Sequence, residues 1–232
     1  MSTPSKNQGL RARVKTAKGR KVGSTRWLER QLNDPYVKLA KAEGYRSRAA
    51  YKLLELDERF GFLKGSKRVI DLGIAPGGWT QVVRKKAPQA AIVGIDLLET
   101  DPIEGATILQ MDFMDDKAPA LLSEALGGKA DLVLSDMAAN TVGHPQTDHL
   151  RTMGLVEAGL EFAVEVLRPG GSFVAKVLAG GGDNQLVAEL KRRFTHVKHA
   201  KPPASRKGSS EWYVVAQGFK GRDKPAEADP DS

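Results

Sequence analysis

The stretch Asp71-Leu72-Gly73-Ile74-Ala75-Pro76-Gly77-Gly78-Trp79 decides the class of fold. It follows the short apolar run Arg68–Leu72 and precedes a helical pattern that begins near Trp79. A glycine-rich turn between a strand and a helix lets the backbone approach a ligand at the carboxyl edge of a parallel sheet. The glycine spacing does not fit G-x-G-x-x-G, which disfavours a nicotinamide-dependent oxidoreductase.

Strand-like and helix-like patterns alternate on both sides of this turn. The predicted strands are Arg68–Leu72, Ala91–Asp96, Ala106–Met111, Asp131–Ser135, Ser172–Leu178, Thr195–His199 and Glu211–Gln217. The predicted helices are Arg46–Phe60, one from Trp79, His149–Leu167 before the stop signal Pro169-Gly170-Gly171, and Asn184–Phe194. This alternation predicts an α/β fold with a mainly parallel seven-stranded sheet and helices on both faces. The loop before the final strand is too short for a crossover helix, so we expect that strand to be antiparallel.

The chain of 232 residues suits one domain with two tails. Residues 1–30 contain nine Lys or Arg and one acid, Glu29, which is typical of a disordered basic arm. A mere solubility tail and a mitochondrial transit peptide remain alternatives for this arm. Residues 31–220 are predicted to form the domain, and residues 221–232 a polar tail.

The composition excludes several kinds of chemistry. The chain has no cysteine, which excludes disulfides, zinc–thiolate sites and cysteine nucleophiles. No apolar run is long enough for a membrane span and no secretory signal is visible, so we expect a cytoplasmic protein. The four histidines form no convergent set, and no metal site is predicted. The net charge of +8 favours an acidic partner such as a nucleic acid, although this hint is weak alone.

Four predicted strands have an aspartate at or next to their carboxyl end. These residues are Asp71, Asp96, Asp112 and Asp136. Each alone is more often a cap or a turn residue than a ligand contact. Because the carboxyl ends of parallel strands share one edge, the four carboxylates would repel one another unless a ligand, water or cation compensates. The pattern predicts a binding site for a cationic small molecule at this edge.

Lys176 lies inside Phe173–Leu178, a strand that is otherwise apolar on both faces. Such a lysine loses hydration, which lowers its pKa unless a carboxylate compensates. A lysine that snorkels from the strand end is the structural alternative. Lys52 in the helix before the sheet and Glu211 at the start of the final strand could reach the same edge, although either alone is more often a solvated charge.

Three segments together resemble the FtsJ family of ribose 2′-O-methyltransferases. They are Asp71–Trp79, Ser135-Asp136-Met137-Ala138-Ala139-Asn140 and Arg46-Ser47-Arg48-Ala49. The resemblance runs from about Arg26 to Gln217 and is greatest to the bacterial heat-shock enzymes that methylate a uridine of 23S ribosomal RNA. The chain departs from the family pattern at Ile74, where Ala is usual, and at Ala139, where Pro is common. Neither change removes a functional group.

The resemblance implies a Rossmann-like methyltransferase fold and S-adenosylmethionine as the cofactor. It implies Gly77 and Trp79 at the methionine end of the cofactor, Asp96 at its ribose, Asp112 at its adenine and Asp136 near the reacting group. The acidic edge fits this cofactor, because its sulfonium and ammonium groups are positive.

The resemblance also assigns Lys52, Asp136, Lys176 and Glu211 to the family's Lys-Asp-Lys-Glu tetrad. Methyl transfer is an in-line displacement, so the ribose oxygen, the methyl carbon and the sulfur must be aligned. Lys176, with its pKa lowered by burial and poised by Asp136, could accept the hydroxyl proton or orient the oxygen lone pair. Lys52 could hold the nucleotide or stabilise alkoxide charge, and Glu211 could position either lysine.

Other methyl acceptors fit the sequence less well. Carbon-5 methylation of pyrimidines through a cysteine adduct is impossible without cysteine. Methylation of exocyclic amines usually requires an Asn/Asp-Pro-Pro-aromatic motif, and the chain has Ser-Asp-Met-Ala-Ala-Asn at residues 135–140. The expected reaction is therefore 2′-O-methylation of a uridine in 23S ribosomal RNA of an assembled or late-assembling 50S subunit.

Two alternatives remain open: a related enzyme that acts on transfer RNA or an mRNA cap, and a catalytically silent RNA-binding assembly factor. Cations of the arm, of the helix bearing Arg46, Arg48 and Lys52, and of the loop Lys201–Lys207 are predicted to contact RNA phosphates. A solvated surface is the alternative for each. We expect no membrane association, and a monomer is the default.

Overall fold

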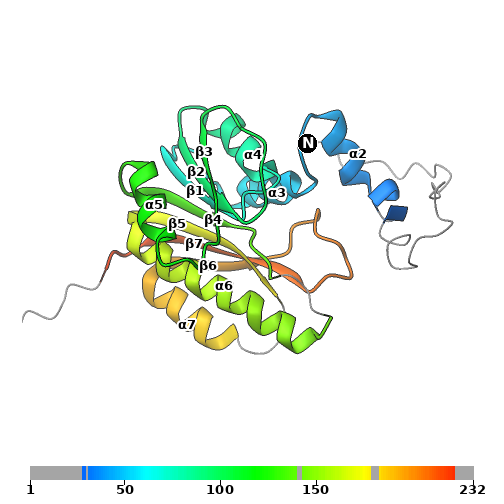
Figure 1. Ribbon diagram of the computed structural model, residues 1–232. Helices are drawn as coiled ribbons and strands as arrows, with labels where there is room; N and C mark the ends of the chain where they lie inside the picture. The colour runs from blue at the N-terminus through cyan, green and yellow to red at the C-terminus, as the bar shows by residue number, and fades with distance from the viewer. Residues whose placement is uncertain (1–27, 30, 140–142, 179–182, 223–232) are drawn as a thin grey trace, which may run out of the picture.

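The computed structural model describes residues 28–29, 31–139, 143–178 and 183–222. The predicted basic arm and polar tail therefore lie almost entirely outside the described residues. Figure 1 shows one twisted sheet with helices on both faces. The strands are β1 (Arg68–Leu72), β2 (Ala91–Asp96), β3 (Ala106–Gln110), β4 (Ala130–Ser135), β5 (Leu167–Leu178), β6 (Phe194–Ala200) and β7 (Glu211–Phe219).

The strand order is β3-β2-β1-β4-β5-β7-β6. Strands β1 to β5 pair in parallel, and β7 pairs antiparallel with both β5 and β6. The predicted mainly parallel sheet with an antiparallel final strand is confirmed. In this register Glu211 lies opposite Leu178, so β7 begins at the edge where the parallel strands end.

Two hydrophobic layers hold the helices on the sheet. The helices are α2 (Pro35–Ala42), α3 (Ala49–Phe60), α4 (Gly78–Lys86), α5 (Ala118–Leu126), α6 (Pro145–Val166) and α7 (Asp183–Arg193). Leu122 of α5, Leu160 of α6 and Leu190 of α7 belong to the core on one face. Leu53 of α3 and Val82 of α4 belong to the core on the other face. Helix α3 therefore crosses the sheet on the face opposite to α6 (Figure 1).

Two helices, α2 and α5, were not predicted. Asp34 caps α2 by accepting a hydrogen bond from the backbone N–H of Tyr36, and Pro35 occupies the first turn. Helix α5 ends at Gly127 in the left-handed conformation that glycine favours. Both signals are present in the sequence. Helix α6 also begins earlier than predicted, at Pro145, because proline suits the first turn of a helix.

The strand β5 begins before its predicted start at Ser172. It includes the Pro169-Gly170-Gly171 stop signal, and its register against β4 shifts between Ala130 and Leu132. The additional residues of β5 are accommodated by this shift, which is an irregularity in the β4–β5 pairing. No helix within the described residues is both long and apolar enough to cross a bilayer.

Candidate active site

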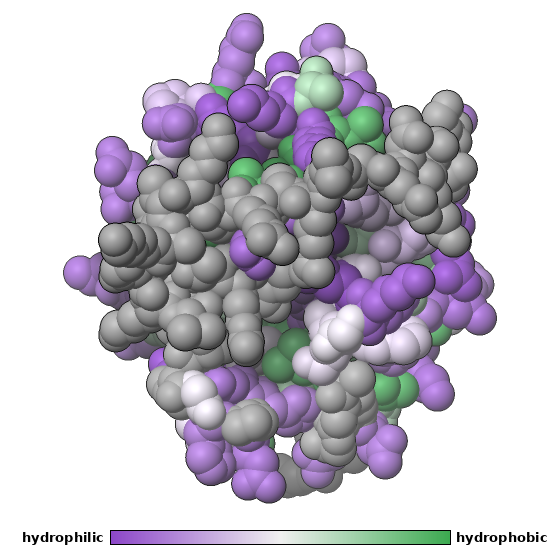
Figure 2. Space-filling model, turned by 90° about the vertical axis from the view of Figure 1, so that its right-hand side faces the viewer, coloured by the Kyte–Doolittle hydropathy of each residue, from purple (hydrophilic) through white to green (hydrophobic). Residues whose placement is uncertain are grey.

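Four separate elements bring the predicted tetrad together at the carboxyl edge of the sheet. Lys176 lies near the end of β5, Asp136 directly follows β4, and Glu211 begins β7. Lys52 reaches this edge from the first turns of α3. Figure 2 looks onto this side of the molecule, where hydrophilic residues surround small hydrophobic areas.

The four residues form two ion pairs. Nζ of Lys176 lies 3.2 Å from Oδ1 of Asp136 and also donates to the backbone carbonyl of that residue. Nζ of Lys52 lies 2.6 Å from Oε1 of Glu211. The two lysine side chains are only 11% and 13% exposed, so both charges are largely shielded from water and need their partners.

Tyr213 joins the two ion pairs. Its hydroxyl lies 2.9 Å from Oδ1 of Asp136 and 3.0 Å from Oε1 of Glu211, so its one hydrogen is shared between two carboxylates. The ring lies under Lys52, whose Nζ is 5.8 Å from the ring centroid. The sequence analysis missed this residue. The sequence feature that could have identified Tyr213 is its position two residues after Glu211, because residues two apart lie on the same face of a strand.

The surrounding charges shift two acid–base equilibria. Burial raises the pKa of Asp136, but Lys176, Lys52 and the Tyr213 hydroxyl outweigh it and hold that pKa below its usual value. Burial, and then the charges of Asp136 and Glu211, raise the pKa of Tyr213 well above its usual value. Asp136 is therefore a carboxylate at neutral pH, and Tyr213 remains a hydroxyl donor.

A cleft of about 540 Å³ lies beside the tetrad. It is lined by residues from the ends of β1 to β4 and from α6, among them Gly73, Asp96, Asp112, Asp136, Met137 and Arg151. Of the five expected cofactor residues, Asp96, Asp112 and Asp136 line this cleft. Gly77 and Trp79 do not. The Trp79 indole is buried and donates to the carbonyl of Ala49, 2.9 Å away.

The acids of the cleft are held by backbone groups. Asp96 accepts hydrogen bonds from the N–H groups of Ala75 and Leu98, both at 2.9 Å. Asp112 accepts one from Met114 at 2.9 Å. Each carboxylate oxygen retains a further lone pair, so both acids remain able to accept bonds from a ligand. Leu98 and Met114 also expose apolar surface to the cleft, being 68% and 57% exposed.

Asp71 behaves differently from the other strand-end acids. Its carboxyl group is completely buried beneath the glycine-rich turn. Oδ2 accepts a hydrogen bond from the Thr80 hydroxyl at 2.7 Å, whereas Oδ1 is buried without a partner. Burial raises the pKa of Asp71 to about 7 against this hydrogen bond, and the charges of Asp136 and Asp96 add to the rise. Repulsion from Asp136 and Asp96 thus contributes to the raised pKa of Asp71, although burial is the larger cause.

Arg46 fastens the glycine-rich turn to the loop after β2. Its guanidinium donates to the carbonyls of Pro76, Asp101 and Pro102, at 3.2, 2.7 and 2.8 Å. Gly77 lies under this contact with a φ of +107°, and a Cβ there would come within 2.5 Å of Ile103. Glycine is therefore required at this position by both conformation and space.

Arg48 is not placed to contact RNA phosphate, as was predicted, and it does not face solvent. Its side chain is 15% exposed, pairs with Asp34 and donates to the carbonyl of Ala204. This corrects the expectation that Arg48 contacts phosphate, because its charge is used to fasten α2 and the β6–β7 loop to α3. Lys201 donates one hydrogen bond to the carbonyl of Ser209, which leaves its other two N–H donors for a further partner. The sequence could not show these partners, since all are distant or lie in a loop.

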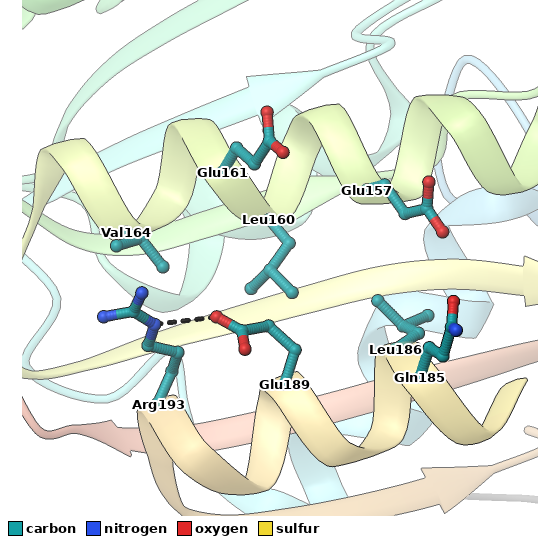
Figure 3. A pocket seen from close by; sticks show the side chains of 8 residues that line it. All are labelled: Glu157, Leu160, Glu161, Val164, Gln185, Leu186, Glu189 and Arg193. Atoms are coloured by element: carbon teal, nitrogen blue, oxygen red, sulfur yellow. Dashed lines mark hydrogen bonds and ion pairs between the residues drawn. The ribbon is translucent and has the colours of Figure 1, made fainter.

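A second hollow, of about 290 Å³, lies between α6 and α7, remote from the tetrad (Figure 3). Its floor includes Leu160 and Leu186, and Glu157 and Glu161 lie on its rim. The negative charges of these carboxylates would repel an RNA phosphate. Within the described part of the chain, no group of three or more His, Asp or Glu side chains is arranged to hold a metal ion.

Comparison with known proteins gives a consistent assignment. The model of the FtsJ-like methyltransferase family matches residues 45–219. The chain belongs to this family. This FtsJ-like methyltransferase is 79% identical over 221 residues to the ribosomal RNA large subunit methyltransferase E of Rhizorhabdus wittichii, covering 95% of this chain and 96% of that protein. It is 75% identical over 210 residues to the protein of the same name from Novosphingobium aromaticivorans, covering 90% and 95% of the two chains.

The fold of this FtsJ-like methyltransferase also matches solved structures. A ribosomal RNA methyltransferase from Plasmodium falciparum superposes with a TM-score of 0.69 at 34% identity. The match covers 77% of this chain and 100% of that structure. The seven-stranded sheet is thus that of an FtsJ-like methyltransferase.

Proposed function

We propose that the protein transfers a methyl group from S-adenosylmethionine to the ribose 2′-oxygen of a uridine in the ribosomal RNA of the large subunit. The observation that carries this proposal is that Tyr213 links two ion pairs, Lys176–Asp136 and Lys52–Glu211, beside the acidic cleft. The relatives named as large-subunit RNA methyltransferases support the choice of RNA.

The described cleft suits S-adenosylmethionine in size and in chemistry. Asp96 and Asp112 present carboxylates along it, and Leu98 and Met114 present apolar surface that suits a planar base. Asp136 lies where the cleft meets the tetrad. When bound, the cofactor supplies an electrophilic methyl group. Gly77 and Trp79 would act beneath this site by shaping the turn and the start of α4, which they occupy.

Lys176 is the residue that we place against the ribose hydroxyl. Its ammonium uses two donors on the carboxylate and carbonyl of Asp136, and a third remains to bond the 2′-oxygen. This arrangement favours the orienting role, in which the lysine turns the oxygen lone pair toward the methyl carbon. Lys52, held by Glu211, would fix the nucleotide and stabilise charge on the 2′-oxygen, whose proton would be released to water as the oxygen takes up the methyl group.

A direct test uses large ribosomal subunits from cells that lack the protein. The purified chain and S-adenosylmethionine are added, and ribose methylation is mapped along the RNA. We expect one new 2′-O-methyl uridine in large-subunit RNA and none with Lys176→Ala. Methylation of transfer RNA instead would support the first alternative. Cofactor binding or RNA binding without any methyl transfer would support a silent assembly factor and would refute the proposal.

A further inference from the structure

Trp212 stands exposed beside the tetrad. It lies between Glu211 and Tyr213 in β7 and pairs with Val177 of β5. Because side chains alternate along a strand, its indole points to the face of the sheet opposite to theirs. The residue is 37% exposed, whereas Trp79 is only 3% exposed. An indole is thus left accessible to solvent one residue from the catalytic edge.

A cation is held against this indole. Nζ of Lys201 lies 6.0 Å from the centroid of the Trp212 ring, and it donates to the carbonyl of Ser209. Further along the same loop, Arg206 has a side chain that is 40% exposed, and its Nε lies 3.7 Å from Oδ2 of Asp34, so part of its charge is already paired. An exposed aromatic ring with a cation held against it is the chemistry with which proteins bind single-stranded nucleic acid. The ring accepts a base by stacking, and the cations attract phosphates.

We propose that Trp212 and Lys201 form a stacking platform for an unpaired nucleobase next to the methylated nucleotide. Trp212 would stack on the base, and Lys201 would contact the phosphate of that nucleotide. The platform would thereby hold the RNA strand while the adjacent ribose enters between Lys52 and Lys176. This inference rests on the proposed function, because it requires RNA at the tetrad.

The binding experiment uses the fluorescence of Trp212. Trp27 is replaced in the full chain (Trp27→Phe), which leaves Trp212 and the buried Trp79 as indoles. A single-stranded, uridine-containing RNA oligonucleotide is then titrated. We expect saturable quenching that disappears when Trp212 is also changed to Phe. Quenching that remains unchanged in this second variant would overturn the proposal.

The kinetic experiment compares Trp212→Ala, Trp212→Phe and the control Leu121→Ala on large subunits. Leu121 lies on α5 and is 40% exposed, so it matches Trp212 in exposure but is remote from the tetrad. We expect KM for RNA to rise roughly tenfold in Trp212→Ala, as loss of one stacked base predicts. kcat should stay within about twofold, as expected for a group that contributes to binding alone. The Phe and Leu121 variants should resemble the wild type.

The outcomes separate the two proposals. A wild-type KM in Trp212→Ala would overturn the platform and leave the methyltransferase assignment intact. If the wild type transfers no methyl group to RNA, the proposed function fails, and the quenching titration still tests the platform. A change in sedimentation of Trp212→Ala would instead show that a second copy of the chain covers the indole, which also overturns the proposal. A lowered thermal midpoint would show that Trp212→Ala is unfolded. In that case the proposal is tested by the fluorescence titration, in which Trp212→Phe should abolish the quenching by RNA.

Discussion

The hydroxyl of Tyr213 lies 2.9 Å from Oδ1 of Asp136, and this contact couples two ion pairs that come from four different elements. The same hydroxyl lies 3.0 Å from Oε1 of Glu211. Without it, two carboxylates at the carboxyl edge of the sheet would face each other with no shared donor. A substitution that disturbs the Lys52–Glu211 ion pair should therefore affect the Lys176–Asp136 ion pair through the Tyr213 hydroxyl.

Removal of this hydroxyl should alter the pH dependence of methyl transfer. In Tyr213→Phe, Asp136 loses one of the groups that lower its pKa, so that pKa should rise. The acid limb of the kcat profile should move to higher pH, and kcat at its plateau should fall about tenfold with little change in KM. Stability should fall by about 1 kcal/mol, as for one hydrogen bond. A pH–rate profile identical to that of the wild type would show that the bridge has only a structural role.

Lys176→Ala should lower kcat by at least about 100-fold, because the group that orients the ribose hydroxyl is lost. The affinity for S-adenosylmethionine, measured by calorimetry, should change little, since the cleft beside the tetrad is lined by other residues. Lys129→Ala is a suitable control, because Lys129 donates to the carbonyl of Glu165 on the surface. Near-normal turnover with normal cofactor binding would remove Lys176 from the mechanism.

Asp71 should make the stability of the fold fall as the pH rises. Its pKa is raised from its ordinary value of 3.8 to about 7, so between these values the folded state keeps a proton that the unfolded state has lost. The stabilisation is complete below pH 3.8 and is lost as the pH rises through about 7, a span on the order of 4 kcal/mol. In Asp71→Asn this slope should disappear. Urea denaturation at intervals from pH 4 to pH 8 measures it, and equal slopes in both proteins would contradict the prediction.

Arg46→Ala should weaken cofactor binding more than RNA binding. The variant loses the donors that fasten the carbonyls of Pro76, Asp101 and Pro102, so the glycine-rich turn and the loop after β2 should loosen. We expect the Kd of S-adenosylmethionine to rise about tenfold, as the loss of roughly 1.4 kcal/mol would produce. If RNA affinity alone changed, and with it the salt dependence, Arg46 would be a phosphate contact instead.

Deletion of Met1–Lys21 should weaken RNA binding and flatten its dependence on salt. The deleted segment carries much of the positive charge of the predicted basic arm, and each phosphate contact contributes to the salt dependence. The catalytic rate at saturating RNA should remain. Titrations of RNA at low and moderate salt test this, and unchanged curves at both would leave the arm without a role in RNA binding.

Much of the fold could be predicted because the evidence for it is local. The apolar runs that became β1 and β2 have the predicted bounds, and the glycine-rich turn between strand and helix lies where expected. The antiparallel β7 followed from loop length. Helices α2 and α5 were missed although their caps are visible in the sequence, because helices of 8 and 9 residues contain too few turns for a clear apolar periodicity.

The sequence by itself determined the alternation of strands and helices, the acids at the strand ends and the unusual lysine within β5. Only the tertiary structure decided how these residues are paired. Arg48 was predicted to contact phosphate but pairs with Asp34, and Tyr213 was not singled out although its hydroxyl bonds Asp136. The physical reason is that periodicity reports the face on which a side chain lies. Its partner depends on which strands and helices become neighbours, and that order is set by packing across the whole sheet.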